Sequence, residues 1–459
     1  MNTIQYNYSI LFFSKITTLL FILLACFATP ISAQDLGLSM MTNLHQTNTL
    51  NPATMTDRKF IFSFPGVTGS VGSSDLTYNK LTTTNEAGET IIKANDLVAS
   101  LRPQNTIWSN TSLEIFHLSF GSNRWQISMG HAIKMNNNVT IPKTLAQLVL
   151  QGNEQFLGET VNIAPQFNMT SYSEWSIATA INYGRLTLGL RAKLLGGLSN
   201  FSSGNAVANI HTNDQSIYEL TLASDYTIRS AGLIEITGLE DENEEIELTT
   251  GEIDLFNALF GENKGFAFDL GATFKVSDKL TVTGSIIDLG KITWSKNANT
   301  YTSKGDYEYK GLDVLDLLKD EDTNLSQIAD TLTDIFKFNK KQDNYSTGLT
   351  VRSYWTANYQ LSEKFTVGGL IHTRHHQGTF DPTFAVNGAM NMGRWWTLGA
   401  IVSQGKSTGF SVGVNTALRL GPVQLFFATD NLPGLIKPLD HGYAHGRVGM
   451  NLAFGKREA

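Results

Sequence analysis

Residues 266–276 read Phe-Ala-Phe-Asp-Leu-Gly-Ala-Thr-Phe-Lys-Val. Every second residue from Phe266 to Val276 is apolar, and the residues between them are small or polar. Successive side chains of a β-strand point to opposite faces, so this period of two predicts a strand with one apolar and one mixed face. A strand packed on the core of a soluble protein has the same pattern, and one segment therefore decides little.

The alternation recurs along the chain, in segments close to the ~10 residues that a tilted membrane strand needs. Pro65 falls inside the first of these runs and predicts a bulge or an interrupted strand there. About fifteen candidate strands result. They lie near residues 59–71, 111–121, 124–135, 173–184, 185–195, 216–228, 266–277, 279–288, 345–360, 363–374, 383–391, 394–404, 409–420, 422–430 and 446–455. Because single-chain bacterial barrels have even strand numbers, we expect an all-β fold, a transmembrane antiparallel β-barrel of about 14 strands, with 16 as the alternative.

The composition agrees with a membrane barrel and argues against a helical membrane protein and a nucleic-acid-binding protein. The chain of 459 residues has 40 glycines, 16% charged residues and one cysteine, and its mean hydropathy is −0.11. After Gln34 no apolar run is long enough to cross a membrane as a helix. The net charge is −7 and no basic stripe occurs, so we expect no nucleic-acid partner.

The N-terminus predicts export. Lys15 precedes an apolar run from Ile16 to Ala28, and Ile31-Ser32-Ala33 then forms a cleavage site before Gln34. Residues 1–33 are therefore predicted to be a signal peptide, and the mature barrel is expected in the cell outer membrane, in contact with its lipid. Leu23-Leu24-Ala25-Cys26 also resembles a lipoprotein cleavage box, but the ordinary site that follows favours Cys26 as a residue of the signal core.

Five segments make up the rest of the predicted organisation. Residues 34–58 form an N-terminal segment and candidate hatch, and residues 59–455 form the barrel. A helical insert is predicted near 311–338, where it either caps the barrel mouth or plugs the lumen, or else packs as an ordinary loop helix. The acidic stretch 239–254 matches no EF-hand spacing, which favours a solvated loop over a calcium site. The glycine- and serine-rich residues 196–205 predict a flexible loop.

No pattern of residues predicts catalysis, a cofactor or a metal site. His372, His375 and His376 cluster near a strand, but no cysteine lies nearby, so they indicate loop or interfacial histidines. We therefore expect a protein that is not an enzyme. The mixed faces of the strands carry charges that either line a pathway through the lumen or pair with each other and close it. These candidate lumen-lining residues are Arg191, Lys193, Asp269, Lys275 and Arg419.

Several motifs resemble known barrels. Asn51-Pro52-Ala53, just before the first strand, resembles a signature of FadL-like barrels, which include long-chain fatty-acid transporters and type IX secretion proteins. Residues 264–272, 287–290 and 430–432 are similar to a Bacteroidota outer-membrane barrel family filed as domain of unknown function 5723, over nearly all of the mature chain. The last strand, with its late Phe454, resembles barrel termini that the assembly machinery recognises. The glycine- and alanine-rich run of fatty-acid transporters is replaced here by His-Gln-Thr-Asn-Thr-Leu at residues 45–50.

Two functional hypotheses follow. The first is passive transport of a small or hydrophobic solute across the outer membrane, which the Asn-Pro-Ala resemblance motivates. The alternative is a closed barrel that serves as a scaffold or attachment factor in secretion or adhesion and binds a partner protein. The two hypotheses differ in whether the lumen is continuous.

Overall fold

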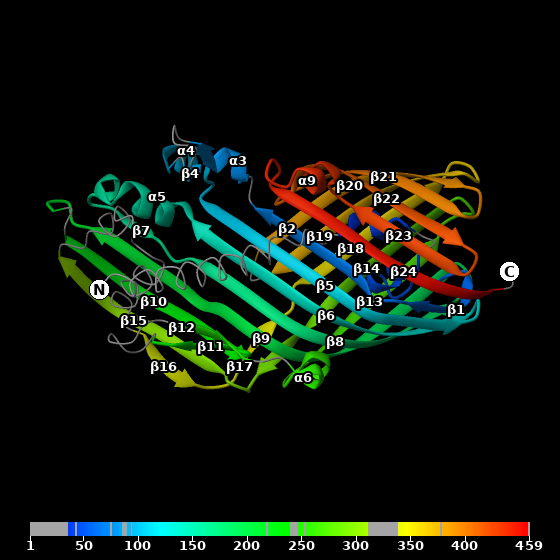
Figure 1. Cartoon of the computed structure of the whole chain (residues 1–459), viewed down its shortest axis with the longest axis horizontal. Coiled ribbons are helices and arrows are strands. Elements are labelled where there is room, and N and C mark those ends of the chain that lie inside the picture. The colour runs from blue at the N-terminus through cyan, green and yellow to red at the C-terminus, as the bar shows by residue number, and fades with distance from the viewer. Residues whose placement is uncertain are drawn as a thin grey trace, which may run out of the picture.

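Fourteen antiparallel strands close on themselves into a barrel (Figure 1). The first is broken into β1 (Arg58–Ser63) and β2 (Gly66–Ser73). Both halves pair with β24 (Tyr443–Lys456) on one side and with β5 (Gln104–Gly121) on the other, which joins the first strand to the last. Closure leaves no sheet edge, so the wall strands satisfy one another's backbone groups where lipid offers no hydrogen bonds.

The predicted barrel of 14 strands is confirmed, and so is the interruption at Pro65, which separates β1 from β2. Of the fifteen predicted strands, only 216–228 lies outside the barrel wall; it is β10 (Glu219–Gly232). The other wall strands are β6 (Trp125–Pro142), β8 (Gln166–Asn182), β9 (Leu186–Thr212), β13 (Asn263–Lys275), β14 (Leu280–Trp294), β17 (Tyr345–Gly348) with β18 (Val351–Gln360), β19 (Phe365–His376), β20 (Thr379–Met392), β21 (Trp396–Gly405), β22 (Gly409–Leu420) and β23 (Val423–Thr429).

The structure describes most of the chain after the predicted signal peptide. The described residues are 35–41, 44–73, 76–84, 90–92, 94–216, 219–238, 247–251, 254–310, 338–376 and 379–457. The signal peptide (1–33), all of the predicted helical insert except Phe338, and most of the acidic stretch lie outside them. Within them, no helix combines the length and the apolar character that a membrane span requires.

The two ends of the barrel differ. At one end, which carries the C-terminus, short turns join neighbouring strands at 122–124, 183–185, 276–279 and 361–364 (Figure 1). Short turns of outer-membrane barrels face the periplasm. The opposite end carries the longer connections and most of the remaining elements. These are α3 (Tyr78–Leu81), β3 (Thr82–Thr84), β4 (Thr90–Ile92), α4 (Ala94–Ser100), α5 (Lys143–Gln151), η2 (Glu154–Phe156), β7 (Thr160–Asn162), β11 (Ile234–Thr237), β12 (Glu247–Thr250), α6 (Leu255–Phe260), β15 (Asn299–Lys310), β16 (Asn339–Gln342) and α9 (Leu432–Ile436).

The wall separates an apolar outside from a polar inside. Outward positions carry exposed large apolar side chains, for example Ile177, Leu194, Phe266, Val386 and Phe410. The positions between them are buried in the lumen and are largely polar or charged. Exposed aromatic residues also gather near the short turns, as in the girdles of membrane barrels; they include Phe60, Phe120, Trp125, Tyr183, Phe365 and Trp395. The protein is therefore an outer-membrane β-barrel.

β9 continues well beyond the barrel wall. Its first half pairs with β13, and its second half pairs with β10, which in turn pairs with β15. The prediction of a flexible loop at 196–205 is therefore wrong. Its glycines mark close packing instead, because a Cβ on Gly196 would lie 1.7 Å from the Phe260 carbonyl oxygen and one on Gly197 would lie 2.6 Å from Trp294.

Candidate functional site

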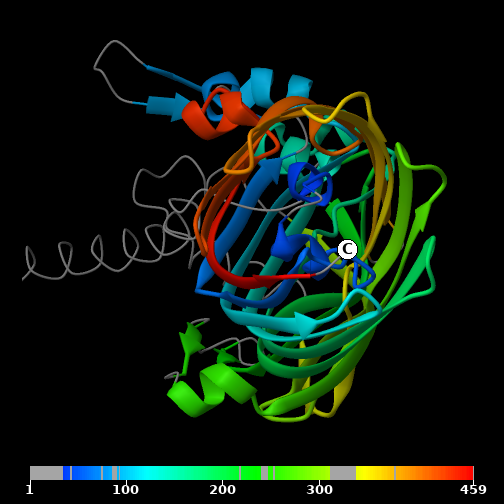
Figure 2. The ribbon, with the colours of Figure 1, turned by 90° about the vertical axis from the view of Figure 1, so that its right-hand side faces the viewer.

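The N-terminal segment (residues 35–41 and 44–57) lies inside the ring of strands (Figure 2). It contains the short helix α2 (Leu36–Ser39) and the 3-10 helix η1 (His45–Thr49). Most of its side chains are buried, including the polar ones of His45, Gln46 and Asn48. Buried polar groups cost free energy unless they are hydrogen-bonded, so the contacts between this segment and the wall determine how firmly it is held.

Carboxylates and an arginine hold the start of the segment. The Asp430 carboxylate, just after β23, accepts hydrogen bonds from the backbone N–H groups of Leu36 at 2.9 Å and Gly37 at 2.8 Å. Arg447 donates to Asp35 at 2.9 Å and also pairs with Glu114. Burial alone would raise the pKa of Asp35, but the positive charge of Arg447 and the neighbouring imidazole of His445 outweigh it and lower the pKa to about 2. Asp35 thus stays ionised and bound to Arg447 at any physiological pH.

Asn51-Pro52-Ala53 lies against two facing glycines of the wall. Gly189 of β9 and Gly271 of β13 are register partners. A Cβ on Gly271 would lie 2.1 Å from the Asn51 side-chain oxygen, and one on Gly189 would lie 2.2 Å from the Ala53 nitrogen. Only glycine lets the motif approach this closely. The Asn51 amide also donates to the Ala272 carbonyl oxygen at 3.3 Å and accepts from the Ala53 N–H at 2.9 Å.

A buried ionic network lines the neighbouring wall. Asp269 pairs with Arg191 at 3.0 Å and with Lys193 at 2.8 Å. Lys193 also contacts Asp288 at 2.5 Å, and Asp288 accepts from Arg352. Glu174 joins the network through Lys134 at 2.6 Å and Lys193 at 3.8 Å. Breaking such a pair leaves an uncompensated buried charge, which costs about 3–5 kcal/mol.

Arg191 connects this network to the N-terminal segment. It donates to the Asn48 carbonyl oxygen at 2.6 Å, to the Asn48 side chain at 2.8 Å and to the Thr49 carbonyl oxygen at 3.0 Å. Of the residues singled out in the sequence, the structure brings Arg191, Lys193 and Asp269 together. Lys275 is exposed at the last position of β13. Arg419 lies near the short-turn end, 3.5 Å from Asp57. Neither joins the network.

Sequence reasoning missed the other members of the site. Glu174, Asp288 and Arg352 lie on strands whose register is not visible in the sequence. Asp430 belongs to residues 430–432, one of the segments that resemble the family. That resemblance is the sequence signal that could have identified Asp430 as a site residue. His445 is buried within β24, and its Nδ1 accepts a hydrogen bond from the Asp430 N–H at 2.7 Å.

The opposite side of the lumen is apolar. Side chains from α2 and the following residues pack on inward side chains of β14 and β18 to β23. This cluster comprises Leu36, Leu38, Met40, Met41, Leu44, Leu50, Ile287, Tyr354, Leu370, Ala385, Ile401, Ala417 and Phe426. The N-terminal segment therefore covers an apolar strip of the wall with one side and meets the ionic network with the other.

His45 of the segment stacks on His117 of β5. The ring centroids are 4.3 Å apart and the planes differ by 16°. Both rings are buried, and among the described residues neither His45 nitrogen has a hydrogen-bond partner. Burial, together with the charges of Arg191 and Arg457, lowers the pKa of His45 to about 3. His45 must therefore be neutral while it is buried against His117.

A polar cavity of about 120 Å³ borders the segment within the lumen. Its lining includes Glu114, Lys134, Arg352, Arg447 and His372. A second polar cavity shares Asn110, Asn136 and Arg374 with it. Among the described residues, no group of three His, Cys, Asp or Glu side chains is placed to hold a metal ion. The lumen thus presents an electrostatically mixed surface on the side of the segment that faces β5, β6 and β8.

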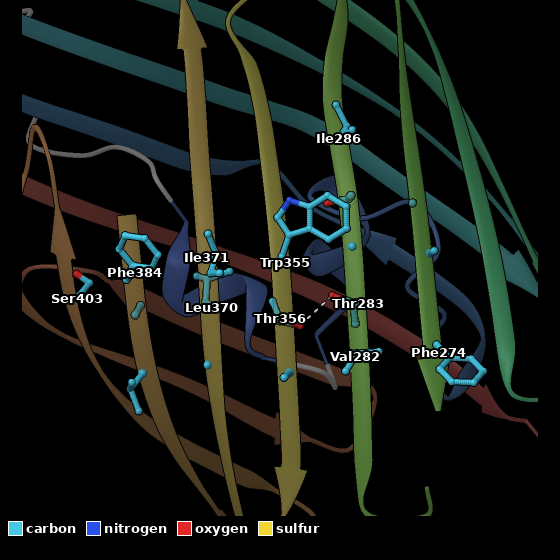
Figure 3. A pocket seen from close by; sticks show the side chains of 18 of the residues that line it. Phe274, Val282, Thr283, Ile286, Trp355, Thr356, Leu370, Ile371, Phe384 and Ser403 are labelled. Carbon is cyan, nitrogen blue, oxygen red and sulfur yellow. Dashed lines mark hydrogen bonds between the residues drawn. The ribbon is translucent and has the colours of Figure 1, made fainter. Parts of the chain in front are cut away.

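The outer face of the wall carries a separate hollow of about 1170 Å³ (Figure 3). It extends from β9 and β13 to β22. Its outward lining is almost wholly apolar and includes Phe274, Trp355, Ile371, Phe384 and Phe410. Inward-pointing neighbours of these residues belong to the apolar strip that the N-terminal segment covers, so one stretch of wall has an apolar surface on both faces.

A family model described as a family of unknown function, DUF5723, matches residues 52–430. The chain belongs to this family. The predicted DUF5723 membership is therefore confirmed, and the match extends from Pro52 of the Asn-Pro-Ala motif to Asp430, the residue that binds the start of the N-terminal segment. No curated protein matches the sequence.

Solved structures similar to this DUF5723 protein include hydrocarbon channels and transporters. A TodX mutant, a monoaromatic hydrocarbon channel, is 10% identical with a TM-score of 0.43, over 90% of this chain and 95% of that one. The Ralstonia pickettii toluene transporter TbuX is 10% identical with a TM-score of 0.38, over 89% and 92%. A Pseudomonas aeruginosa FadL homologue is 11% identical with a TM-score of 0.38, over 90% and 94%. Similarity of this degree carries no argument about the function of the present chain.

Proposed function

We propose that this protein is a gated, passive channel for a small solute across the outer membrane, and that its N-terminal segment is the gate. One observation carries the proposal: the lumen is filled by a separate stretch of chain rather than by side chains of the wall alone. Hydrogen bonds and ion pairs hold that stretch at Asp430, Arg447 and Arg191. A segment held by such contacts can move while the wall stays closed to lipid.

The two sides of the lumen favour an amphipathic solute. Displacement of the N-terminal segment would uncover the apolar strip that includes Tyr354, Leu370 and Phe426. The ionic network around Asp269 and Asp288 lies on another part of the same lumen. A small molecule with one apolar part and one polar or charged part would find a complementary surface for each.

Deletion of residues 35–48 is the direct test. The variant keeps Asn51-Pro52-Ala53 and the whole wall, and we expect long-lived, discrete conductance steps in planar bilayers where the full-length barrel opens rarely. Liposomes that carry the variant should swell faster in isosmotic hexanoate than in isosmotic glucose.

The migration of unheated and heated samples in SDS gels first shows that the deletion variant is folded. A folded variant that neither conducts ions nor admits either solute would overturn the proposal. Equal swelling in hexanoate and glucose would be consistent with a channel, but it would contradict the proposed preference for an amphipathic solute.

A closed barrel that binds a partner protein is the second candidate. It is favoured by the sheet of β9, β10, β15 and β16, which extends past the barrel wall and has its own apolar core around Leu222, Tyr226 and Tyr301. Such a surface suits attachment in secretion or adhesion. A silent deletion variant, together with a protein cross-linked to β15 or β16 in cells, would favour this function over transport.

A further inference from the structure

We propose that the hollow on the outer wall is a binding site for one acyl chain of an outer-leaflet membrane lipid. The hollow lies among the lipid-facing residues of the barrel, so its occupant must come from the bilayer. It is independent of the proposed gate, because it faces away from the lumen.

Small outward residues on four adjacent strands create the hollow. Ala272 of β13, Gly284 of β14, Ala357 of β18 and Gly369 of β19 occupy outward positions. Neighbouring outward positions of the same strands carry large apolar side chains, such as Phe274, Trp355 and Ile371. The Trp355 ring leans over Gly284, where a Cβ would lie 2.7 Å from it. The result is a recess with a low floor and an aromatic border. Figure 3 labels Trp355, Ile371 and Phe384, which lie on three neighbouring strands.

The register shows the length and direction of the recess. One row of direct partners crosses the wall strands from β13 to β22, and it consists of Ala272, Gly284, Trp355, Ile371, Phe384, Gln404 and Phe410. Six steps between neighbouring strands of about 4.8 Å each give about 29 Å. Barrel strands tilt by about 35–45°, so the row is inclined by a similar angle to the membrane plane. It therefore rises through more than half of the ~30 Å hydrocarbon core.

The upper end of the recess is polar. Gln404 is exposed near the end of β21, and it is the one outward polar side chain in this row. Lys406 is exposed in the adjacent loop, where its ammonium group donates to the Phe380 carbonyl oxygen at 3.1 Å. These two groups lie at the end away from the periplasm. They suit the polar linkage and an anionic phosphate of a lipid whose chain runs down the row toward Ala272.

The wall behind the recess is continuous. β13, β14, β18, β19, β20, β21 and β22 pair residue by residue along the whole row, and β13 and β14 have only one register shift, between Phe268 and Leu270. A chain in the recess therefore contacts the outside of the wall without entering the lumen. The site differs in this respect from a solute pathway.

Gly369→Leu fills the recess and is the main test variant. An added Cβ at Gly369 would have one neighbour, the Ala385 carbonyl oxygen, at 4.0 Å, so the new side chain enters open space. Gly388→Leu is the matched control, because Gly388 is an outward glycine of β20 outside the recess and has no atom within 4 Å of an added Cβ. Ala357→Leu provides a second filling variant if Gly369→Leu does not fold.

The measurement is native mass spectrometry of delipidated barrel in mild detergent, titrated with dipalmitoyl phosphatidylglycerol. We expect one tightly retained lipid in the full-length protein and in Gly388→Leu, and at least a tenfold loss of affinity in a filled variant. Lys406→Glu should weaken binding of phosphatidylglycerol more than that of phosphatidylcholine, and free palmitate should compete if the chain alone is recognised. Equal retention by the filled variant and the control, or no retained lipid in the full-length protein, would overturn the proposal. Neither result depends on whether the barrel conducts.

Discussion

Replacing Gly271 with valine is expected to open the barrel. The new Cβ would lie 2.1 Å from the Asn51 side-chain oxygen and 2.9 Å from the Pro52 ring, and both distances are too short for a non-bonded contact of a Cβ atom. The Asn-Pro-Ala motif must then leave the wall, and it carries the rest of the N-terminal segment with it. Overpacking of this kind costs about 1–3 kcal/mol. The ratio of open to closed barrels should therefore rise roughly 5- to 150-fold, since each 1.4 kcal/mol is about tenfold.

Single-channel recording measures this ratio as the open probability. Gly189→Val should act in the same direction, because its Cβ would meet the backbone of Pro52 and Ala53 on the neighbouring strand. Gly388→Val is the control for valine in place of a strand glycine, since open space surrounds that position. An open probability that is the same in all three variants would show that contact between the motif and the wall does not keep the lumen closed.

Acid is expected to favour the open barrel through His45. In the closed state its pKa is about 3, whereas a histidine in water titrates near 6.5. Above pH 6.5 His45 is neutral in both states and favours neither. As the pH falls below 6.5, the displaced His45 gains a proton that the buried one cannot hold, and the closed state loses stability until about pH 3. At pH 5 this difference amounts to about 2 kcal/mol, or roughly a 30-fold rise in the ratio of open to closed barrels.

The charged neighbours of His45 reinforce this direction. Arg191 of β9 and Arg457 after β24 both lower its pKa, and the stacked ring of His117 on β5 adds no hydrogen bond to either nitrogen. His45→Gln removes the titration and should flatten the dependence of open probability between pH 7.5 and pH 5. His211→Gln is the control, because His211 is exposed on β9 outside the lumen. An unchanged acid response in His45→Gln would assign that response to another group.

The barrel could be predicted from the sequence because lipid and lumen impose opposite requirements on alternate residues. This alternation is visible within a single strand, as in residues 266–276, so it can be recognised without knowing which strands pair. The wrong prediction at 196–205 has a physical reason as well. Glycine and serine are typical of loops, yet here Gly196 and Gly197 allow Phe260 and Trp294 to approach the strand closely.

The interior of the barrel was only partly accessible to sequence reasoning. Arg191, Lys193 and Asp269 could be identified because they are charged residues on the mixed faces of strands whose other faces are apolar. Their partners Glu174 and Asp288 could not, because the register between strands decides which charges meet. The contact of Asp430 with Leu36 joins residues 394 positions apart, and no local pattern indicates it. The lipid-facing recess was also not visible in the sequence, because its small residues become neighbours only when the strands pair.

A disulfide between the N-terminal segment and the wall provides the most direct test of the gate. A Cβ on Gly37 would lie 3.6 Å from the Asn415 Cβ, within the ~3.5–4.5 Å that a disulfide spans. The single native cysteine, Cys26, falls in the predicted signal peptide. We expect Gly37→Cys/Asn415→Cys, made in the Gly271→Val background, to be silent in planar bilayers when oxidised and to conduct when dithiothreitol is added. Conductance that is equal before and after reduction would contradict a gate formed by the N-terminal segment.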